Sequence, residues 1–312
     1  MRPVTSSPSI ASLFRPREVA AELRTSLEDF VARFTAGLER AVPSTAALSS
    51  RVAALDVAQA PRKKTKTEVV VASFNVLGSS HTRAGGNKPG YASGPARMHQ
   101  AVKALRSHEV DVVGFQEFER DQAHEFKKLT GDDFGVFPGQ RPHLRSVNSL
   151  AWNRKEWKLV KADTVKVPYF NGKLQEMPVV LLQNRATGQK AFFANFHNPA
   201  STRRFPNQER FRDRATEIEI DLVHRLRRKT GLPVFVTGDM NERQEVRDRF
   251  ARRTDLHDAQ RAAHDRASKR VGIDWIFGGG GVRFTDFDRD QRVQRRRVSD
   301  HPLVVANAVI RG

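Results

Sequence analysis

Short apolar runs that are rich in Val and Phe recur from residue 68 onward, and they constrain the fold more than any other feature of the chain. The clearest runs end in polar residues and span 69–75, 110–117, 191–197 and 233–241. Such runs, bounded by turn residues, are typical of buried strands. Weaker runs predict strands over 149–152, 157–167, 179–183, 273–277 and 302–310, and helical patterns separate them at 97–107, 121–129 and 208–229. Many strands with a few helices between them predict an α/β or α+β layered sandwich.

Residues 1–66 differ from the rest of the chain. Apolar residues recur at spacings of three or four between Arg17 and Val42, with charged residues at the other positions. This pattern predicts one amphipathic helix. A basic linker follows over 61–66. We therefore predict an N-terminal extension over 1–66 and a main domain over 67–312, with the helix either mediating self-association or packing on its own chain.

Charge and cysteine content limit the function classes. The 312 residues include 54 Lys and Arg against 35 Asp and Glu, a formal net charge of +19. The positive electrostatic field of such a chain favours polyanionic partners, first nucleic acid and second anionic lipid surfaces. Cys is absent, which excludes a disulfide scaffold and any zinc or iron–sulfur site with Cys ligands. No secretory peptide or membrane-spanning stretch is recognisable, so the default expectation is a cytoplasmic protein, with secretion left open.

Polar side chains with related chemistry stand at or beside the ends of the predicted strands. They are Asn75, Glu117, His197, Asp239, Asn241, Asp274, Asp300 and His301. A single polar strand end usually marks only where the chain reaches the surface, but the recurrence of oxygen donors and imidazoles favours a shared site. Carboxylate and amide oxygens suit Mg²⁺, Mn²⁺ or Ca²⁺. The set therefore predicts a site for a hard divalent cation.

Two of these groups have a recognisable acid–base pattern. Asp239 and Asn241 are two residues apart, so they share one face of an extended segment. Asp300 and His301 are adjacent, and a second acid, Asp274, begins another apolar run. A carboxylate that accepts a hydrogen bond from one imidazole nitrogen raises the basicity of the other nitrogen. This combination predicts a general base that takes a proton from water.

The chain resembles the endonuclease/exonuclease/phosphatase superfamily, which includes deoxyribonuclease I, abasic-site endonucleases, neutral sphingomyelinases and inositol polyphosphate 5-phosphatases. The resemblance covers residues 68 to 310. The motifs that carry it follow in order as Ser73-Phe74-Asn75, Gln116-Glu117, Asn195-Phe196-His197-Asn198, Gly238-Asp239-Met240-Asn241, Ile273-Asp274-Trp275-Ile276 and Ser299-Asp300-His301-Pro302. It implies a four-layer α/β sandwich of two packed mixed β-sheets flanked by helices. It also implies a divalent-metal phosphodiesterase or phosphatase.

The resemblance also implies roles for individual residues. The implied ligands of Mg²⁺ or Mn²⁺ are Asn75, Glu117 and Asp300. The implied catalytic residues are His197, Asp239, Asn241, Asp274 and His301. Among these, His301 activates the attacking water and Asp274 orients it, while Asp239 and Asn241 position the water and the phosphate. His197 stabilises the phosphate or protonates the leaving oxygen.

Two local features narrow the position within the superfamily. The stretch from His197 to Ala200 is more like deoxyribonuclease I and the sphingomyelinases than the abasic-site enzymes. Leu77 stands where some abasic-site enzymes carry a metal-binding acid. Both features make abasic-site repair a less favoured function.

Two basic segments bear on the substrate. The glycine-rich stretch 78–95 carries His81, Arg83, Lys88 and Tyr91, and it is either a substrate-contacting loop or an idle surface loop. A run of arginines immediately precedes Asp300 and predicts a clamp on the phosphate backbone of a substrate, with Arg295, Arg296 and Arg297 as the contacting residues.

The favoured function is a metal-dependent nuclease with little sequence specificity. The alternative enzyme is a phospholipid or phosphoinositide hydrolase of the sphingomyelinase kind. The alternative outside the enzymes is a nucleic-acid-binding protein on a decayed family scaffold, with the N-terminal helix as an assembly module. Loss of a motif residue would favour that last alternative, and all of the motifs are intact.

Overall fold

The computed structural model describes residues 16–38, 66–139, 146–263 and 271–311. One six-stranded sheet contains β1 (Lys66–Asn75), β2 (Val112–Gln116), β3 (Phe134–Phe137), β4 (Ser149–Asn153), β11 (Val282–Asp290) and β12 (Leu303–Arg311). Its strand order is β11-β12-β1-β2-β4-β3. The other six-stranded sheet contains β5 (Trp157–Pro168), β6 (Leu174–Asn184), β7 (Lys190–His197), β8 (Val234–Asp239), β9 (His257–Asp258) and β10 (Asp274–Gly279). Its strand order is β5-β6-β7-β8-β10-β9.

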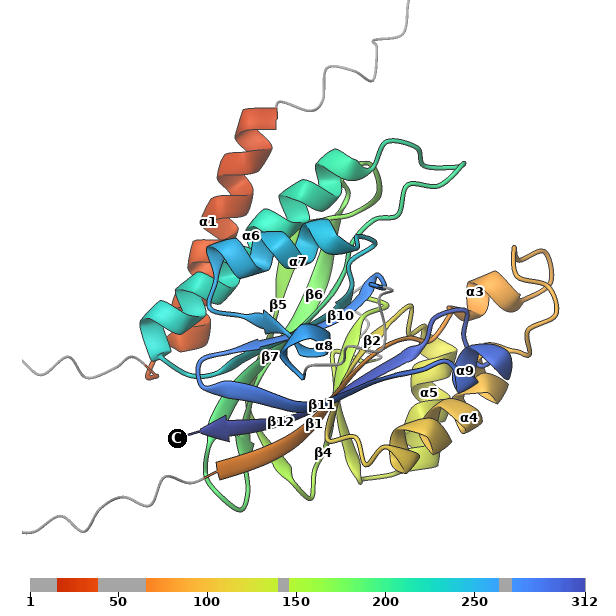
Figure 1. Ribbon diagram of the computed structural model, residues 1–312. Coiled ribbons are helices and arrows are strands. Elements are labelled where there is room, and N and C mark those ends of the chain that lie inside the picture. The colour runs from red at the N-terminus through yellow and green to blue at the C-terminus, as the bar shows by residue number, and fades with distance from the viewer. Residues whose placement is uncertain (1–15, 39–65, 140–145, 264–270, 312) are drawn as a thin grey trace, which may run out of the picture.

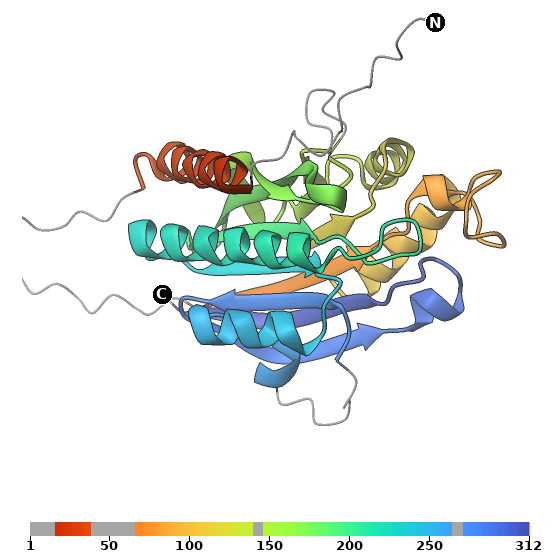
Figure 2. The ribbon, with the colours of Figure 1, turned by 90° about the horizontal axis from the view of Figure 1, so that it is seen from above.

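Helices cover the outer faces of both sheets, as Figures 1 and 2 show. The helices are α1 (Pro16–Thr35), α3 (Ser79–Thr82), α4 (Gly94–Ser107), α5 (Arg120–Thr130), α6 (Glu209–Thr230), α7 (Gln244–Arg253), α8 (Ala259–Ala262) and α9 (Arg292–Arg295), with a 3-10 turn, η3, at Phe170–Gly172. The first sheet packs against α4 and α5, and the second packs against α1, α6 and α7. None of the helices in the described ranges combines the length and the apolar character needed to cross a membrane.

The two sheets pack face to face around a continuous apolar layer. Val71 and Val112 of the first sheet face Phe193 and Phe235 of the second within this layer, and all of them are buried. The rings of Phe193 and Phe235 stack with centroids 5.0 Å apart. Both faces of each sheet are therefore covered, which explains why the strand sequences are continuous apolar runs. The predicted four-layer α/β sandwich is confirmed.

Strand pairing brings the polar strand ends to one edge of the sandwich. Because β1 runs parallel to β2, and β7 to β8, the carboxyl ends of each pair meet on the same side. His197 lies opposite Asp239 in the parallel pair, and Asp274 lies opposite Asp239 in the antiparallel pair of β10 with β8. Three predicted site residues of the second sheet thus occupy one row across adjacent strands.

Helix α1 corrects one prediction and supports another. It ends at Thr35 and not at Val42, because Gly37 adopts a left-handed conformation (φ 78°) that closes the helix. Its apolar side chains, including Phe30 and Phe34, are buried against the second sheet, where Phe34 contacts Phe192 with ring centroids 5.8 Å apart. The face that self-association would need is therefore occupied within the chain. Residues 39–42 and most of the predicted linker lie outside the described residues.

Several elements were not predicted from the sequence. They are β3, β9, β11, α3, α7, α8 and α9. In α7 only Val246 and Phe250 are buried, so the apolar signal is a single pair four residues apart. Strand β11 lies at the edge of its sheet and alternates apolar with charged residues, a pattern weaker than that of the buried strands. The other missed elements are two to four residues long, too short to leave a periodic pattern.

Candidate active site

The two sheets contribute different parts of one polar cluster. Elements of the first sheet position Asn75, Glu117, Asp300 and His301, and elements of the second position His197, Asp239, Asn241 and Asp274. Hydrogen bonds between the sheets join the two parts, because Asn75 Nδ2 donates to Asp239 Oδ2 at 3.1 Å and His301 Nδ1 lies 2.9 Å from Asp274 Oδ1. The cluster is therefore a product of the sandwich and not of either sheet alone.

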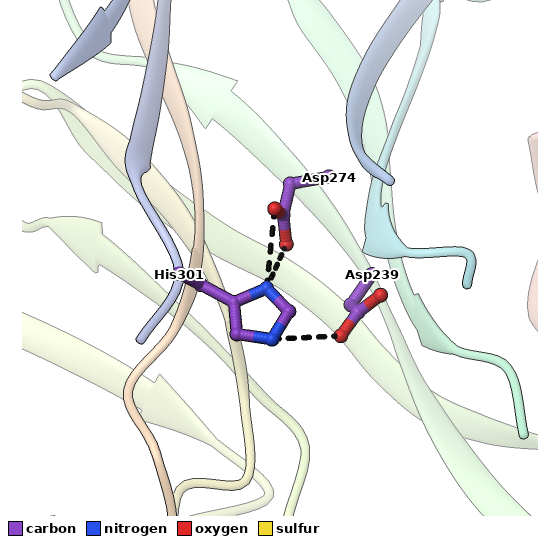
Figure 3. Close-up of side chains that lie close together, drawn as sticks. All are labelled: Asp239, Asp274 and His301. Carbon is purple, nitrogen blue, oxygen red and sulfur yellow. Dashed lines mark hydrogen bonds and ion pairs between the residues drawn. The ribbon is translucent and has the colours of Figure 1, made fainter. Parts of the chain in front are cut away.

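Figure 3 shows His301 between two aspartates. Its Nδ1 lies 2.9 and 3.1 Å from the two carboxylate oxygens of Asp274, and its Nε2 lies 3.7 Å from Asp239 Oδ2. The backbone is fixed as well, because Ser299 Oγ accepts from the His301 amide at 3.1 Å and donates to the Asn75 carbonyl at 2.6 Å. Since Asp274 binds Nδ1, the imidazole presents Nε2 toward the interior of the site.

The surrounding carboxylates change the acid–base properties of His301. Burial disfavours the charged imidazolium, but the negative charges of Asp274 and Asp239 outweigh it and hold the pKa of His301 well above its usual range. A carboxylate that holds an imidazole in this way fixes its tautomer and strengthens it as a base. The pair of Asp274 and His301 is therefore suited to accept a proton from water.

Asn75 links two carboxylates. Its amide nitrogen donates to Glu117 Oε1 at 3.0 Å as well as to Asp239, while its amide oxygen accepts from the Leu77 backbone N–H at 3.0 Å. Burial opposes ionisation of Glu117, but electrostatic interaction with His197 and hydrogen bonds from the Gly78 amide and Asn75 together lower its pKa. Glu117 is thus kept as a carboxylate, and Asn75 orients it in the predicted ligand position.

The backbone adopts unusual conformations at the site. Glu117 and Asn241 both have positive φ, 55° and 48°. Such conformations are disfavoured for residues other than Gly, and they concentrate at functional sites. In Asn241 the backbone N–H donates to Asp239 Oδ1 at 3.1 Å, and Nδ2 donates to the Asn198 carbonyl at 2.8 Å. The left-handed turn at Asn241 therefore places its backbone N–H on the Asp239 carboxylate and its side-chain amide on the Asn198 carbonyl.

His197 completes the second sheet's part of the site. Its Nε2 lies 3.6 Å from Asp239 Oδ2, and its Nδ1 lies 3.4 Å from the hydroxyl of Tyr169. Burial and the nearby carboxylates of Glu117 and Asp239 raise the pKa of Tyr169, so its hydroxyl remains protonated. Tyr169 was not predicted as a site residue, and no motif in the sequence marks it.

Among the described residues, one group of side chains is close enough together to hold a divalent cation, and its members are predicted catalytic residues and not the predicted ligands Asn75, Glu117 and Asp300. Ligand atoms of Asp239, Asp274 and His301 all lie within 4.8 Å of one another. Carboxylate oxygens of this kind suit Mg²⁺ or Mn²⁺. The predicted ligand Asp300 forms an ion pair of 2.7 Å with Lys88, and His81 Nε2 lies 3.4 Å from Glu117 Oε2. The glycine-rich loop thus brings two basic groups to two of the predicted ligands.

A buried arginine holds the backbone of two segments that carry site residues. Arg97 on α4 is 3% exposed, and its guanidinium donates to the carbonyl oxygens of Val76, Leu77 and Val298 at 2.5, 2.5 and 2.9 Å. These carbonyls belong to the segments that carry Asn75 and His301. Sequence reasoning missed this role, because a charged residue in the first turn of a helix normally faces solvent.

The predicted arginine clamp has two parts. Arg295 and Arg296 are exposed, whereas Arg297 donates to the Gly90 carbonyl at 3.1 Å from a left-handed backbone (φ 54°). Arg297 therefore ties α9 to the glycine-rich loop, and both project from the same side of the molecule in Figure 1. The upstream Arg292 is paired with Asp290 at 2.8 Å. Contact of Arg295, Arg296 and Arg297 with a substrate remains a prediction.

An open groove of about 800 Å³ adjoins the cluster. Asp274, Asp300 and His301 line it on the side of the cluster, and Arg243 and Arg289 line it elsewhere. The lining therefore combines two arginines with three acids, since Glu245 lines the groove as well.

Solved structures with a similar fold include two proteins of Bacteroides thetaiotaomicron and one human protein. An endonuclease/exonuclease/phosphatase family protein from Bacteroides thetaiotaomicron is 17% identical, with a TM-score of 0.61 over 79% of this chain and 96% of its own. The human Nocturnin catalytic domain with bound sulfate anion is 18% identical, with a TM-score of 0.61 over 80% and 98%. The mannosyl-6-phosphatase Bt3783 of B. thetaiotaomicron is 17% identical, with a TM-score of 0.56 over 77% and 99%. These likenesses establish the fold.

A comparison with curated proteins found no significant match. The family model described as "Endonuclease/Exonuclease/phosphatase family" matches residues 72–301, a span that contains every residue of the polar cluster. Since that match covers well over half of the 312 residues, the chain belongs to the Endonuclease/Exonuclease/phosphatase family.

Proposed function

We propose that the protein is a divalent-metal-dependent phosphodiester hydrolase that cleaves nucleic acid with little sequence preference. The observation that carries the proposal is the Asp274–His301 pair, whose free Nε2 points to Asp239 beside Glu117 and Asn75. Family membership supports hydrolysis of a phosphoester bond. The phosphatase and the sulfate-bound catalytic domain among the structural neighbours are consistent with a site for tetrahedral anions.

The chemistry follows from the positions of the side chains. A water molecule attacks phosphorus and gives a proton to His301 Nε2, while Asp274 stabilises the resulting imidazolium. The bond between phosphorus and the leaving oxygen breaks, and His197, whose Nε2 lies 3.6 Å from Asp239 Oδ2, gives the leaving oxygen a proton. Asn241 holds the phosphate. A cation bound by Glu117 and the neighbouring carboxylates would neutralise charge on the phosphate oxygens.

The net charge supports a nucleic-acid substrate. The chain carries +19, and a field of that sign attracts a polyanion and raises its association rate. Arg243 and Arg289 beside the groove add local positive charge. A lipid phosphoester would meet the same charge, so the substrate class is decided by the assay below.

The test is a substrate panel with Mg²⁺ or with EDTA. The panel contains plasmid, single-stranded DNA, RNA, sphingomyelin, a phosphoinositide, a sugar phosphomonoester and bis(p-nitrophenyl) phosphate. We expect nucleic-acid cleavage and bis(p-nitrophenyl) phosphate hydrolysis with Mg²⁺ or Mn²⁺, and neither with EDTA. Full activity in metal-stripped protein would contradict metal dependence. Hydrolysis of only the lipids, or only the phosphomonoester, would replace the nuclease assignment.

A further inference from the structure

Aromatic side chains form a short stack that begins at the active site. The Tyr169 ring contacts His197 with centroids 5.4 Å apart, and Phe170 packs edge-on against Tyr169 at 4.5 Å. Phe205, which is far away in sequence, stacks on Phe170 at 4.7 Å with an interplanar angle of 28°. The rings thus form one continuous stack from His197, and all three of them are half-buried. We call Tyr169, Phe170 and Phe205 the aromatic platform.

Two loops build the aromatic platform, and hydrogen bonds join them. Tyr169 and Phe170 lie in the turn between β5 and β6, and Phe205 lies in the loop that precedes α6, next to that turn in Figure 2. Gln208 bridges them, because its Oε1 accepts from the Asn171 backbone N–H at 2.8 Å and its Nε2 donates to Asn171 Oδ1 at 3.1 Å. Gln208 is buried, at 1% exposure. The platform is therefore preorganised.

The platform has unpaired positive charge around it. Arg203 and Arg204 are exposed, and neither forms an ion pair with any described residue. The guanidinium of Arg204 lies 5.4 Å from the centre of the Phe205 ring. The nearby acid, Glu209, accepts a hydrogen bond from Ser201 at 2.7 Å and lies 3.4 Å from Arg212. The excess charge beside the rings is thus positive.

We propose that the aromatic platform stacks unpaired bases of a nucleic-acid strand whose phosphates contact Arg203 and Arg204, so that the enzyme prefers single-stranded substrate. This inference rests on the proposed nuclease function and names its substrate class. Rings that stack on bases, combined with arginines that follow the backbone, are the usual means of binding single strands without sequence preference. A duplex hides its base faces and cannot use the platform.

A membrane surface is a less suitable occupant. Insertion into lipid needs apolar side chains that project freely, yet Phe170 and Phe205 are only half-exposed and are held by each other and by the neighbouring loop. Among the described residues, the exposed large apolar side chains are Val147 and Leu159, at 38% and 37%. Neither is part of the platform.

Binding is tested with full-length protein carrying His301→Ala, so that the strand stays intact. Fluorescence anisotropy with Mg²⁺ measures the Kd for a labelled single-stranded oligonucleotide and for the blunt duplex of the same sequence. We expect tighter binding of the single strand. Phe205→Leu keeps an apolar side chain but removes the aromatic face, and it should raise the single-strand Kd about tenfold. Phe205→Trp should restore it.

Matched variants control for general effects. Phe134→Ala removes a half-buried ring away from the site. Phe134 is the first residue of β3 and pairs with Asn153 of β4, and the variant should leave the Kd unchanged. Arg203→Gln with Arg204→Gln should weaken single-strand binding more than Lys158→Gln with Arg252→Gln, which removes the same charge from exposed positions elsewhere. Equal binding of strand and duplex, or an unchanged Kd in Phe205→Leu, would overturn the inference.

Two further measurements separate the inference from the proposed function. Wild-type hydrolysis of bis(p-nitrophenyl) phosphate tests the function alone, because that substrate has no bases to stack. If bis(p-nitrophenyl) phosphate is hydrolysed but the protein shows no preference for the single strand and no effect of Phe205→Leu, base stacking on the aromatic platform is wrong and the proposed hydrolase function stands. Binding to vesicles of phosphatidylserine and phosphatidylcholine that persists in Phe205→Leu, without single-strand binding, would assign the rings to a membrane.

Discussion

At the scale of single residues, His301 has contacts that define a role. Asp274 binds one ring nitrogen and leaves the other facing Asp239, and the carboxylates raise the pKa of the imidazole. Asp239 accepts hydrogen bonds from Asn75 and the Asn241 backbone, so it orders the cluster as well. These contacts predict the loss of kcat in variants of His301 and Asp239, and separately the shift of the pH profile in a variant of Asp274.

Loss of either central residue should abolish most turnover. His301→Ala removes the general base and Asp239→Ala removes a group that orders the site, so each should lower kcat by about 10² to 10⁴. His224→Ala is a matched control, because His224 is exposed on α6. Circular dichroism should show intact folds, and steady-state kinetics should show the losses. A folded variant with near wild-type kcat would exclude that residue from the chemistry.

The pH dependence should move when Asp274 loses its charge. A general base works only when it is unprotonated, so kcat/KM should rise with pH through the pKa of His301. Because Asp274 raises that pKa, Asp274→Asn should shift the acid limb to lower pH while lowering the maximum rate. The measurement is kcat/KM against pH for both proteins. If the acid limb stays in place, another group is titrating.

At the scale of elements, helices α1 and α6 show how the outer layer stabilises the sandwich. Helix α1 buries Leu27, Phe30 and Phe34, although it lies in the segment predicted as an extension. Arg225 on α6 forms an ion pair of 3.1 Å with Glu28 on α1. The helix therefore belongs to the packed core of the second sheet, and its loss should reduce stability.

Phe30 gives a direct measure of that packing. Its side chain is 2% exposed and stacks on Phe34 at 5.1 Å. Phe30→Ala should lower the free energy of unfolding by about 3 to 5 kcal/mol through lost burial and a cavity. Arg24→Ala, at an exposed position on the same helix, should stay within about 0.5 kcal/mol. Chemical denaturation measures the free energy of unfolding of both variants. Equal values for Phe30→Ala and Arg24→Ala would show that α1 is not docked in solution.

Glu219 on α6 should make stability depend on pH. Its side chain is completely buried, and that burial raises its pKa to about 8. In the unfolded chain the Glu219 carboxyl ionises near the ordinary Glu pKa of about 4.3. Between this pKa and the pKa of the folded state, the folded chain holds a proton that the unfolded chain releases. Stability is therefore lost as pH rises across this window.

Glu219→Gln cannot ionise and should escape this loss. Relative to wild type, the free energy of unfolding of the variant should increase by about 1.4 kcal/mol per pH unit between about pH 4.5 and 8 and then level off. Urea denaturation at several pH values measures the difference. Well below the ordinary Glu pKa both side chains are neutral in the folded and in the unfolded chain, which provides the internal reference. A difference that stays flat across the window would show that Glu219 does not carry a raised pKa.

At the scale of the whole molecule, charge governs encounter with the substrate. The net charge of +19 predicts strong salt dependence of nucleic-acid binding, with log affinity falling by about 0.9 per contacted phosphate for each tenfold increase in salt on duplex DNA. Arg295 and Arg296 are exposed on α9 or directly after it, whereas Arg297 is tied to Gly90. The clamp is therefore best tested with the first two.

Arg295→Gln with Arg296→Gln should make the salt slope shallower by up to about 1.8, the value for two phosphate contacts. Hydrolysis of bis(p-nitrophenyl) phosphate should not decrease in parallel, since a backbone clamp acts on position and not on bond breaking. Affinity titrations from low to high salt provide the measurement, with Lys158→Gln and Arg252→Gln as the charge-matched control. A slope equal to that of the control would place both arginines in solvent.

The strands, their polar ends and the family resemblance could all be predicted from the amino-acid sequence. Strand periodicity and burial are local properties, so apolar runs placed most of the buried strands within a few residues, and motif order placed Asn75, Glu117, Asp239 and His301 in one family pattern. Elements with little buried surface, such as α7 and β11, left too weak a signal.

Contacts between distant loops could not be predicted from the sequence and are known only from the folded chain. Tyr169 lies against His197, Lys88 pairs with Asp300, and Arg97 holds the carbonyl of Val298 across the first sheet's edge. These pairs are separated by long stretches of chain, and their contact depends on how the turns close after the two sheets have packed. Local pattern contains no information about that closure, because it is set by packing between segments and not by the spacing of residues within one.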